Sequence, residues 1–137
     1  MRVFADTNFL VSAFAARGLS ADVFQLILSA HELVTGEFVL QGLKQTLREK
    51  LKVPENIATE VDQLLRRHYV EPNPDRPSSV KVRDADDRWV LASAINAKAD
   101  ILITGDKDLL EIAEQVKNLK ILSPREFWRV IQRGAER

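Results

Sequence analysis

Short, mostly apolar segments alternate with helical segments along the chain, and no other feature of the sequence constrains the fold as strongly. The apolar segments lack the period of two that marks a half-exposed sheet, which is typical of strands covered on both faces. Alternating strands and helices favour a parallel sheet with helices on both sides. Five strands are predicted, at Arg2–Ala5, Glu32–Thr35, His68–Glu71, Ile101–Thr104 and Leu119–Leu122. We therefore expect an α/β, three-layer fold around a mainly parallel sheet.

Apolar residues at spacings of three and four predict helices between these strands. N-cap candidates are Asp6 or Thr7 for the first helix, Ser20 for the second and Asp108 for the sixth. Ser123 opens a capping box, and a proline follows at the first helical position of the last helix. The expected helices cover Thr7–Ala15, Ala21–Ala30, Phe38–Lys50, a segment from Pro54 to about Arg67, Asp84–Lys98, Leu109–Val116 and Phe127–Gln132.

Nothing in the sequence marks a boundary between two domains. The 137 residues are close to the commonest size of a single domain, and they suffice to bury a core without disulfides or a structural metal. The clearest loop, Glu71–Arg83, holds three prolines, but no complete core precedes it. We therefore expect one domain over residues 1–137.

The composition limits the chemistry that is open to the chain. It contains no cysteine, which excludes a disulfide scaffold, a thiolate nucleophile and zinc sites with cysteine ligands. His31 and His68 are the only histidines, and neither has a partner at the spacing of a metal site. Twenty basic residues balance twenty acidic ones, so a nucleic-acid partner needs a local basic patch. Any catalysis must therefore depend on carboxylates, hydroxyls, amides and basic groups.

Neither a membrane span nor a secretion signal is expected. No segment approaches the roughly 20 consecutive apolar residues that a membrane helix needs. The apolar stretch at the N-terminus is interrupted at Asp6 and is too short for the core of a signal peptide. These features predict a cytoplasmic location.

Four acidic residues lie where a parallel sheet would bring them together. Asp6 and Asp106 each follow a predicted strand, and Asp84 and Asp87 lie three residues apart at the start of a predicted helix. Ligands bind at the carboxyl ends of the strands in such sheets. Carboxylates that share a cleft need a proton or a cation to offset their charge, and Mg²⁺ and Mn²⁺ prefer oxygen ligands. The joint placement predicts a metal site in which the four carboxylates converge.

Each carboxylate also has an ordinary structural interpretation. Asp6 is suited to cap the first helix, and the acidic residues at Asp84–Asp87 suit the first turn of a helix, where the helix dipole favours them. Asp106 and Asp108 are common types of turn residue. The residues alone therefore leave a metal site and a set of caps and turns both open.

Four segments in order carry a resemblance to a known family. Val3–Asn8 reads VFADTN, Arg83–Asp87 reads RDADD, Ala99–Leu110 reads ADILITGDKDLL and Ile121–Phe127 reads ILSPREF. This set resembles the PIN-domain family, in particular the PIN-type toxins of bacterial and archaeal toxin–antitoxin systems, the VapC-like ribonucleases. The resemblance extends along the whole chain, and it implies a PIN-like fold.

The resemblance also implies an activity and a set of site residues. Many PIN domains are ribonucleases that depend on magnesium or manganese, so Mg²⁺ or Mn²⁺ is the expected cofactor. Asn8 and Thr104 are expected to support catalysis by orienting water or carboxylates. Asp108 is expected to be a helix cap or an outer ligand. The expected metal ligands are Asp6, Asp87 and Asp106, which are also the expected catalytic carboxylates, with Asp84 as an accompanying acid.

The third helix departs from the family pattern. Many PIN domains carry a glutamate in the middle of this helix, within a pattern like leucine-x-glutamate-leucine. Aligning the leucines of this chain with that pattern places Gly42 at the position of the glutamate. A glycine inside a helix costs ~1 kcal/mol relative to alanine, so helix stability does not explain it. We expect Gly42 to open onto the cleft and leave it one ligand short, unless Gln41 or Glu37 replaces the missing acid.

Three hypotheses for the function follow. The first is a divalent-metal-dependent endoribonuclease that is the toxin of a toxin–antitoxin pair. The second is a degenerate, non-catalytic PIN domain that binds RNA or a protein partner, because Gly42 has removed a ligand. The third is a phosphoryl-transfer protein with Asp6 as the nucleophile, although the residue two positions on is Asn8 instead of a second aspartate.

The first hypothesis implies an RNA substrate, a cognate antitoxin protein and a homodimer as partners. Two basic clusters are candidates for contact with RNA phosphates, although an ordinary solvated helix surface is the favoured explanation for each of them. A half-exposed apolar patch around Val11 and Phe14 is a candidate surface for a dimer or an antitoxin. The basic clusters are Lys44, Arg48, Lys50 and Lys52, and Arg125, Arg129, Arg133 and Arg137.

Overall fold

The computed structural model describes residues 1–135 and contains one sheet with the strand order β3-β2-β1-β4-β5. All four pairs of neighbouring strands are parallel, so the sheet is wholly, and not just mainly, parallel. The expected α/β class is confirmed. The strands are β1 (Arg2–Ala5), β2 (Glu32–Gly36), β3 (Tyr69–Glu71), β4 (Ile101–Ile103) and β5 (Lys120–Leu122).

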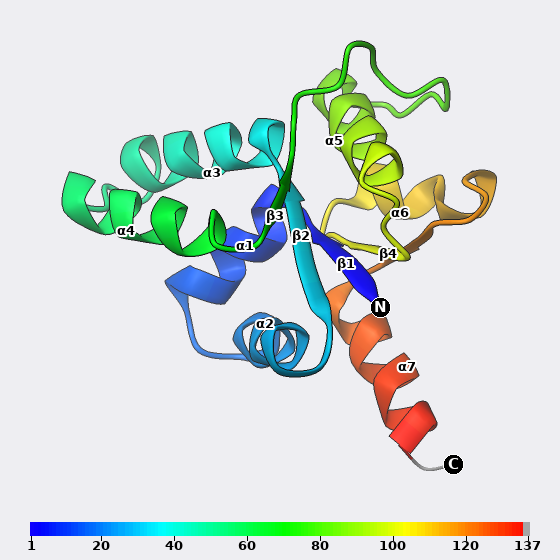
Figure 1. The fold of residues 1–137 in the computed structure, drawn as a ribbon, viewed down its shortest axis with the longest axis horizontal. Helices are drawn as coiled ribbons and strands as arrows, with labels where there is room; N and C mark the ends of the chain where they lie inside the picture. The colour runs from blue at the N-terminus through cyan, green and yellow to red at the C-terminus, as the bar shows by residue number, and fades with distance from the viewer. Residues whose placement is uncertain (136–137) are drawn as a thin grey trace.

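Seven α-helices and one short 3₁₀ segment connect these strands within the described residues. In Figure 1, α5 lies above the sheet, and α2 and α7 pack against each other below it. The pair α3 and α4 projects to one side, next to α1. The helices are α1 (Thr7–Ala15), α2 (Leu19–Ala30), α3 (Glu37–Glu49), α4 (Glu55–Leu65), α5 (Ala85–Asn96), α6 (Lys107–Glu111) and α7 (Pro124–Ala135), and the 3₁₀ segment is Ala113–Gln115.

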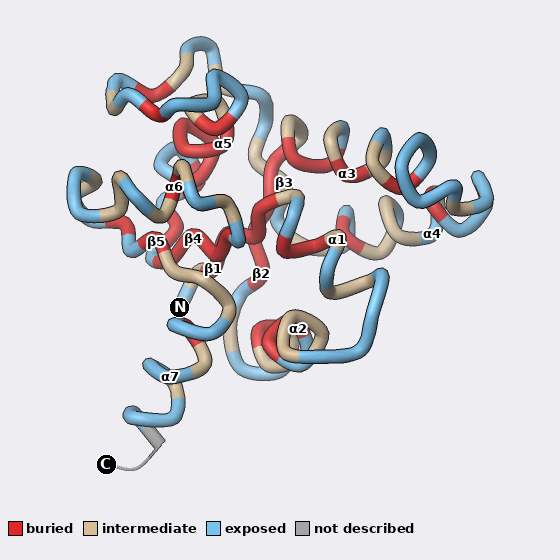
Figure 2. The backbone as a smooth tube through the Cα atoms, turned by 180° about the vertical axis from the view of Figure 1, so that it is seen from behind, coloured by how far each residue is buried: buried red, intermediate tan, exposed pale blue. Residues whose placement is uncertain are grey.

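The central strand β1 is covered on both faces. Val3, Phe4 and Ala5 are each 0% exposed, although their side chains point alternately to opposite faces of the sheet. Figure 2 shows the buried residues gathered at the sheet and on the inner sides of the helices. Burial on both faces explains why the strand segments carry no polar residue at every second position.

Two predicted N-caps are wrong, and both errors move the start of a helix. The second helix begins at Leu19 because Gly18, with φ of 146°, takes a backbone conformation that favours glycine and ends the preceding turn. The sixth helix begins at Lys107 because Asp106, and not Asp108, is its N-cap. The predicted helix Leu109–Val116 is accordingly an α-helix that starts earlier and a separate 3₁₀ segment.

The proline-containing segment between β3 and α5 is tied to α5 by a single arginine. The guanidinium of Arg88 donates two hydrogen bonds to the carbonyl oxygen of Ser78, from Nε at 3.1 Å and from Nη2 at 2.7 Å. The backbone N–H of Ser78 donates in return to the carbonyl oxygen of Arg88 at 3.0 Å. Ser78 and Val82 are buried as a result, so this segment is fixed over the first half of α5.

No single helix among the described residues is long and apolar enough to cross a membrane. Helices α1 and α2 together have the length and apolar composition of a membrane span, but they are bent by 105° relative to each other and their buried residues belong to the core.

At the other end of the chain, Arg125, Arg129 and Arg133 are exposed on α7. Arg137, the last member of the predicted basic cluster there, lies outside the described residues.

Candidate metal and active site

The candidate site lies where β1 and β4 end side by side. Ala5 is paired with Ile103, so Asp6 and the residues after β4 leave the sheet at the same edge. From β1 the chain passes to β2 on one side, whereas β4 and β5 lie on the other. Ligands bind at such a switch point in open parallel sheets, because the connections there diverge and leave a crevice.

A cleft of about 790 Å³ opens at this edge of the sheet. Its walls come from the start of α1, from α3, from the start of α5 and from the turn after β4. Of the residues predicted as catalytic or as metal ligands, only Thr104 is absent from the walls, because it is fully buried behind them. Asp108, expected as a cap or an outer ligand, does not line the cleft either. The predicted residues that line the cleft are Asp6, Asn8, Gly42, Asp84, Asp87 and Asp106.

Asp6 is held by two hydrogen bonds, one to each carboxylate oxygen. Oδ1 accepts from the backbone N–H of Thr7 at 2.7 Å, which makes Asp6 the N-cap of α1. Oδ2 accepts from the hydroxyl of Thr104 at 2.7 Å. Burial raises the pKa of Asp6, the two hydrogen bonds oppose that rise, and the nearby charge of Asp106 adds to it. Asp6 therefore both caps α1 and lines the cleft.

Thr104 and Asn8 connect the two strand ends. Besides donating to Asp6, the Thr104 hydroxyl accepts a hydrogen bond from the backbone N–H of Asp106 at 3.0 Å. Asn8 lies on the first turn of α1, and its side-chain oxygen accepts from the backbone N–H of Gly105 at 2.9 Å. Both side chains thus fix the turn that carries Asp106 against the start of α1.

Asp87 has no hydrogen-bond partner for one of its oxygens. The residue lies in the first turn of α5 and is only 6% exposed, and its Oδ2 is a buried atom without a partner in the described structure. Burial is the largest cause that raises the pKa of Asp87, to about 8. The charge of Asp106, a hydrogen bond with its side chain, and the charges of Asp6 and Asp84 add to this rise. A buried carboxylate of this kind requires a proton or a cation.

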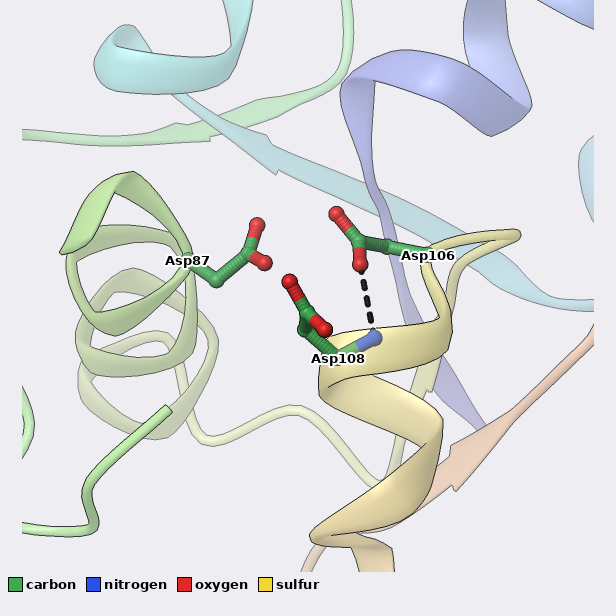
Figure 3. Close-up of side chains that lie close together, drawn as sticks. All are labelled: Asp87, Asp106 and Asp108. Carbon is green, nitrogen blue, oxygen red and sulfur yellow. Dashed lines mark hydrogen bonds between the residues drawn. The ribbon is translucent and has the colours of Figure 1, made fainter. Parts of the chain in front are cut away.

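Asp108 also belongs to the acidic cluster. The sequence predicted this residue only as a helix cap or an outer ligand. Figure 3 shows the carboxylates of Asp87, Asp106 and Asp108 facing one another across the gap between α5 and α6. One oxygen from each of the three lies within 4.8 Å of the others. Asp106 Oδ1 also accepts from the backbone N–H of Asp108 at 2.8 Å. The sequence feature that could have indicated the position of Asp108 in this cluster is its spacing, two residues after Asp106 and immediately after a strand.

A model of the PIN domain family matches residues 2–108 of the chain. The chain belongs to the PIN domain family. Among curated protein sequences, none is significantly similar to it.

Two solved structures show the same fold. The first is VapBC2 from Rickettsia felis bound to a DNA fragment from its promoter, with a TM-score of 0.65, 15% identity, and coverage of 90% of this chain and 98% of the other. The second is VapC20 from Mycobacterium tuberculosis, described as a Sarcin-Ricin loop cleaving toxin, with a TM-score of 0.58, 14% identity, and coverage of 86% and 98%. The sequence-based recognition of a PIN domain resembling VapC-like toxins is confirmed.

The α3 wall of this PIN domain has no carboxylate at Gly42, which faces Thr7. A Cβ atom added at Gly42 would lie 3.4 Å from Thr7 Oγ1, which is ordinary contact distance. Glu37, considered as a replacement for the missing acid, is not among the residues that line the cleft. It forms an ion pair with Arg66, whose two hydrogen bonds are the largest cause that lowers the pKa of Glu37. Gln41 does line the cleft, but its amide carries no negative charge.

The remaining walls contain three further acidic residues, Asp84, Asp86 and Glu49, and one basic residue, Lys50. Asp84 is the N-cap of α5, accepts from the backbone N–H of Asp86 at 2.9 Å and lies exposed at the cleft. Of the basic cluster near the end of α3, Lys50 lines the cleft, whereas Arg48 forms an ion pair with Glu55. Lys50 is therefore the member of that cluster that lies at the cleft.

The PIN cleft fits a divalent ion of the magnesium or manganese type. Its donors are carboxylate oxygens, the ligands that hard divalent cations prefer, and the sequence contains no cysteine to offer a thiolate. The buried, unpartnered Oδ2 of Asp87 would gain a cation as its missing partner. Such an ion would also offset the repulsion between Asp87 and Asp106 that the raised pKa of Asp87 reflects.

Proposed function

We propose that this PIN domain is a cytoplasmic, divalent-metal-dependent endoribonuclease that hydrolyses RNA phosphodiester bonds with Mg²⁺ or Mn²⁺ and acts as the toxin of a toxin–antitoxin pair. The observation that carries the proposal is the buried, unpartnered oxygen of Asp87 among the other carboxylates of one open cleft. Repulsion between these carboxylates lowers the stability of the fold, and a bound cation would offset that repulsion. Family membership and the similarity to VapC folds support the class of reaction.

The carboxylates of the cleft have different roles in this proposal. Asp6, Asp87 and Asp106 hold the ion, and Asp84 adds negative charge at the mouth of the cleft. A divalent ion in this position supplies Lewis-acid chemistry that offsets charge on a phosphodiester under attack by water.

Two further residues keep the carboxylates in position. Thr104 holds Asp6 through its hydroxyl proton and holds the Asp106 backbone through its oxygen. Asn8, fixed by its bond to Gly105, presents its amide group in the cleft wall, where it can orient substrate or water.

The test is cleavage of a labelled RNA by the purified protein. We expect cleavage with Mn²⁺ or Mg²⁺ and none with EDTA. Asp87→Asn should abolish cleavage, because it removes a carboxylate from the centre of the cluster. Asp75→Asn is the matched control, since Asp75 is an exposed aspartate outside the cleft. Cleavage that persists in EDTA, or that Asp75→Asn reduces as much as Asp87→Asn does, would refute the proposal.

A second function remains in competition, and a specific residue favours it. Gly42 removes the α3 carboxylate that the family pattern implies, so a PIN domain that binds RNA or a protein without cutting is the alternative. The same RNA assay separates the two functions. RNA retained on the protein in a gel-shift experiment, with no cleavage at any Mn²⁺ concentration, would establish the alternative.

The proposed partners are an antitoxin and a second copy of the chain. One structural neighbour, VapBC2 from Rickettsia felis, is a complex bound to promoter DNA. Val11 and Phe14 of α1 are half-buried, and Phe14 packs on Phe24 with ring centroids 5.2 Å apart, so a partly apolar surface is present beside the cleft. We expect expression to arrest growth and co-expression of a short adjacent reading frame to restore it. Light scattering of the purified protein tests the dimer.

A further inference from the structure

We propose that the α3 wall of the cleft is a subsite for one unpaired nucleobase of the substrate RNA, in which Phe38 provides a stacking surface and Gln41 and Gln45 hydrogen-bond to the edge of the base. This inference rests on the proposed function in that RNA enters the cleft, and it deepens that function by naming the residues that select a base there. The carboxylates on the other side of the cleft take no part in the selection.

The first argument is the spacing of the cleft-lining side chains along α3. They recur at intervals of three and four residues, so they form one face of the helix. The charged members of this face lie only at its C-terminal end, and the rest of the face carries amide, hydroxyl and aromatic groups. These uncharged residues are Phe38, Gln41, Gly42, Gln45 and Thr46.

The second argument is the separation of charge across the cleft. The aspartates that line it come from the ends of β1 and β4 and from the start of α5, and none comes from α3. In a nucleotide the negative charge is on the phosphate, whereas the base is a flat, uncharged group on the other side of the sugar. An ion held by the aspartates attracts the phosphate to their side of the cleft. The uncharged α3 wall is then the side that faces the base.

The third argument is that the ring of Phe38 is supported from outside the cleft. Phe38 stacks on Trp89 of α5, with ring centroids 6.4 Å apart and the ring planes inclined by 26°. Phe38 is half-buried and lines the cleft, whereas Trp89 does not line it. Proteins bind unpaired bases by stacking them on aromatic side chains. A ring that is already fixed loses little conformational freedom when a base stacks on it.

The fourth argument is the chemistry of the two glutamines. Gln41 and Gln45 lie one turn apart on the cleft-lining face, and both side chains are exposed. Each amide carries a donor and an acceptor, which are the groups that pair with the edge of an unpaired base. Gln45 Nε2 also donates a hydrogen bond to Glu49 Oε2 at 3.3 Å, which orients that amide. Gly42 lies on the same face and adds no side chain that would cover the amides.

The test measures binding of single-stranded RNA decamers by fluorescence polarisation. The probes are oligoadenylate, oligocytidylate and oligouridylate in Ca²⁺, a hard cation that prefers oxygen ligands, and a denaturing gel checks that they remain intact. We expect the wild-type protein to bind the three with different affinities. Phe38→Leu should weaken binding by about fivefold or more, the effect of losing one stacked base. Phe38→Tyr keeps an aromatic ring and should bind like wild type.

An abasic decamer, with the same number of phosphates and no bases, separates stacking from a structural role of Phe38. Phe38→Leu and the wild-type protein should bind this probe equally, because it offers no base to stack. If Phe38→Leu weakens binding of the abasic probe as much as binding of RNA, Phe38 acts through the shape of the cleft and the inference is overturned. Equal RNA affinities for Phe38→Leu and Phe38→Tyr also overturn it.

The variants Gln41→Ala and Gln45→Ala test the selection of the base. At least one of them should lower the ratio between the affinities for the best-bound and the worst-bound decamer. Gln25→Ala is the matched control, because Gln25 is exposed on α2 outside the cleft, and it should leave that ratio unchanged. A ratio that neither cleft variant changes, or equal wild-type affinities for the three decamers, overturns the inference.

The outcomes also separate this inference from the proposed function. RNA cleavage by the wild-type protein together with equal RNA affinities for wild type and Phe38→Leu overturns the inference alone. RNA binding that Phe38→Leu weakens, without cleavage by the wild-type protein at any Mn²⁺ concentration, supports the inference and refutes the endoribonuclease. Absence of both RNA binding and RNA cleavage by the wild-type protein overturns both.

Discussion

The buried hydroxyl of Thr104 donates a 2.7 Å hydrogen bond to Oδ2 of Asp6, across 98 residues of sequence. The same hydroxyl accepts from the backbone N–H of Asp106 at 3.0 Å. One side chain with no exposed surface therefore sets the relative position of two carboxylates that leave neighbouring strands. Its removal should affect the site even though Thr104 itself does not line the cleft.

Thr104→Val should destabilise the fold by about 1–3 kcal/mol, because valine matches the shape of threonine but leaves Asp6 Oδ2 and the Asp106 N–H without their partner. Thr104→Ser keeps the hydroxyl and loses one buried methyl group, which costs about 1 kcal/mol. Denaturation by urea measures both free energies of unfolding, and calorimetry measures Mn²⁺ affinity. Serine should retain that affinity and valine should reduce it. Equal Mn²⁺ affinities for the two variants would contradict the role given to the hydroxyl.

Stability without metal should depend on pH through Asp87. Its pKa is raised to about 8 in the folded protein, whereas an unfolded aspartate titrates near about 4. Between these values the folded state binds a proton that the unfolded state has released. The free energy of unfolding therefore falls as pH rises from about 4 to about 8.

Asp87→Asn tests this dependence in EDTA, because asparagine stays neutral throughout. The free energy of unfolding of the variant minus that of wild type should therefore be larger at pH 8 than at pH 5. Urea denaturation at both pH values measures this difference. Asp75→Asn, in the exposed loop, should show the same difference from wild type at both pH values. A stability difference for Asp87→Asn that does not change with pH would show that Asp87 is already ionised in the folded protein near pH 5.

The segment over α5 should loosen when Arg88 is changed. Arg88→Ala removes two hydrogen bonds to the Ser78 carbonyl, which should cost about 1–3 kcal/mol. Trypsin should then cut faster after Lys81, since the buried residues around it lose their anchor. Arg76→Ala, an exposed arginine in the same segment, is the control and should leave the cutting rate unchanged. Equal rates for the two variants would show that the segment is held by other contacts.

Much of the fold is predictable because the strands are buried on both faces. The uninterrupted apolar segment before Asp6 identifies β1 to the residue, and Glu32 and Ile101 begin β2 and β4 as predicted. The edge strands β3 and β5 begin one residue later than predicted, since hydrogen bonding at a sheet edge leaves no signal in hydrophobicity. Helix starts are less certain, because neighbouring polar residues compete to cap the same turn.

The site was predictable from topology, but its detailed grouping was not. Asp6 and Asp106 end adjacent parallel strands, so alternation of strands and helices alone places them together. The assignment of Asp108 as a cap concealed its place in the cluster, because only coordinates reveal which of two aspartates accepts the helix N–H. Likewise, Glu37 was a candidate from sequence until its pairing with Arg66 was visible.

The residue that departs from the family pattern provides the last prediction. Gly42 lies inside α3, and an added Cβ would meet Thr7 at ordinary contact distances of 3.4 and 3.7 Å. Gly42→Ala should therefore stabilise the protein by about 0.5–1 kcal/mol, because alanine favours a helix more than glycine does. Urea denaturation measures the change. A loss of stability would mean that the contact with Thr7 is tighter than ordinary packing.

Gly42→Glu and Gly42→Gln together test whether the α3 wall lacks a ligand. Both side chains favour the helix and have nearly the same size, but only glutamate restores a negative charge facing the start of α1. Added ligand charge strengthens binding of a hard cation, so calorimetry should give tighter Mn²⁺ binding for Gly42→Glu than for Gly42→Gln. RNA cleavage should then require less Mn²⁺ in the glutamate variant. Equal affinities for the two variants would mean that the ion lies too far from α3 for a glutamate there to reach it.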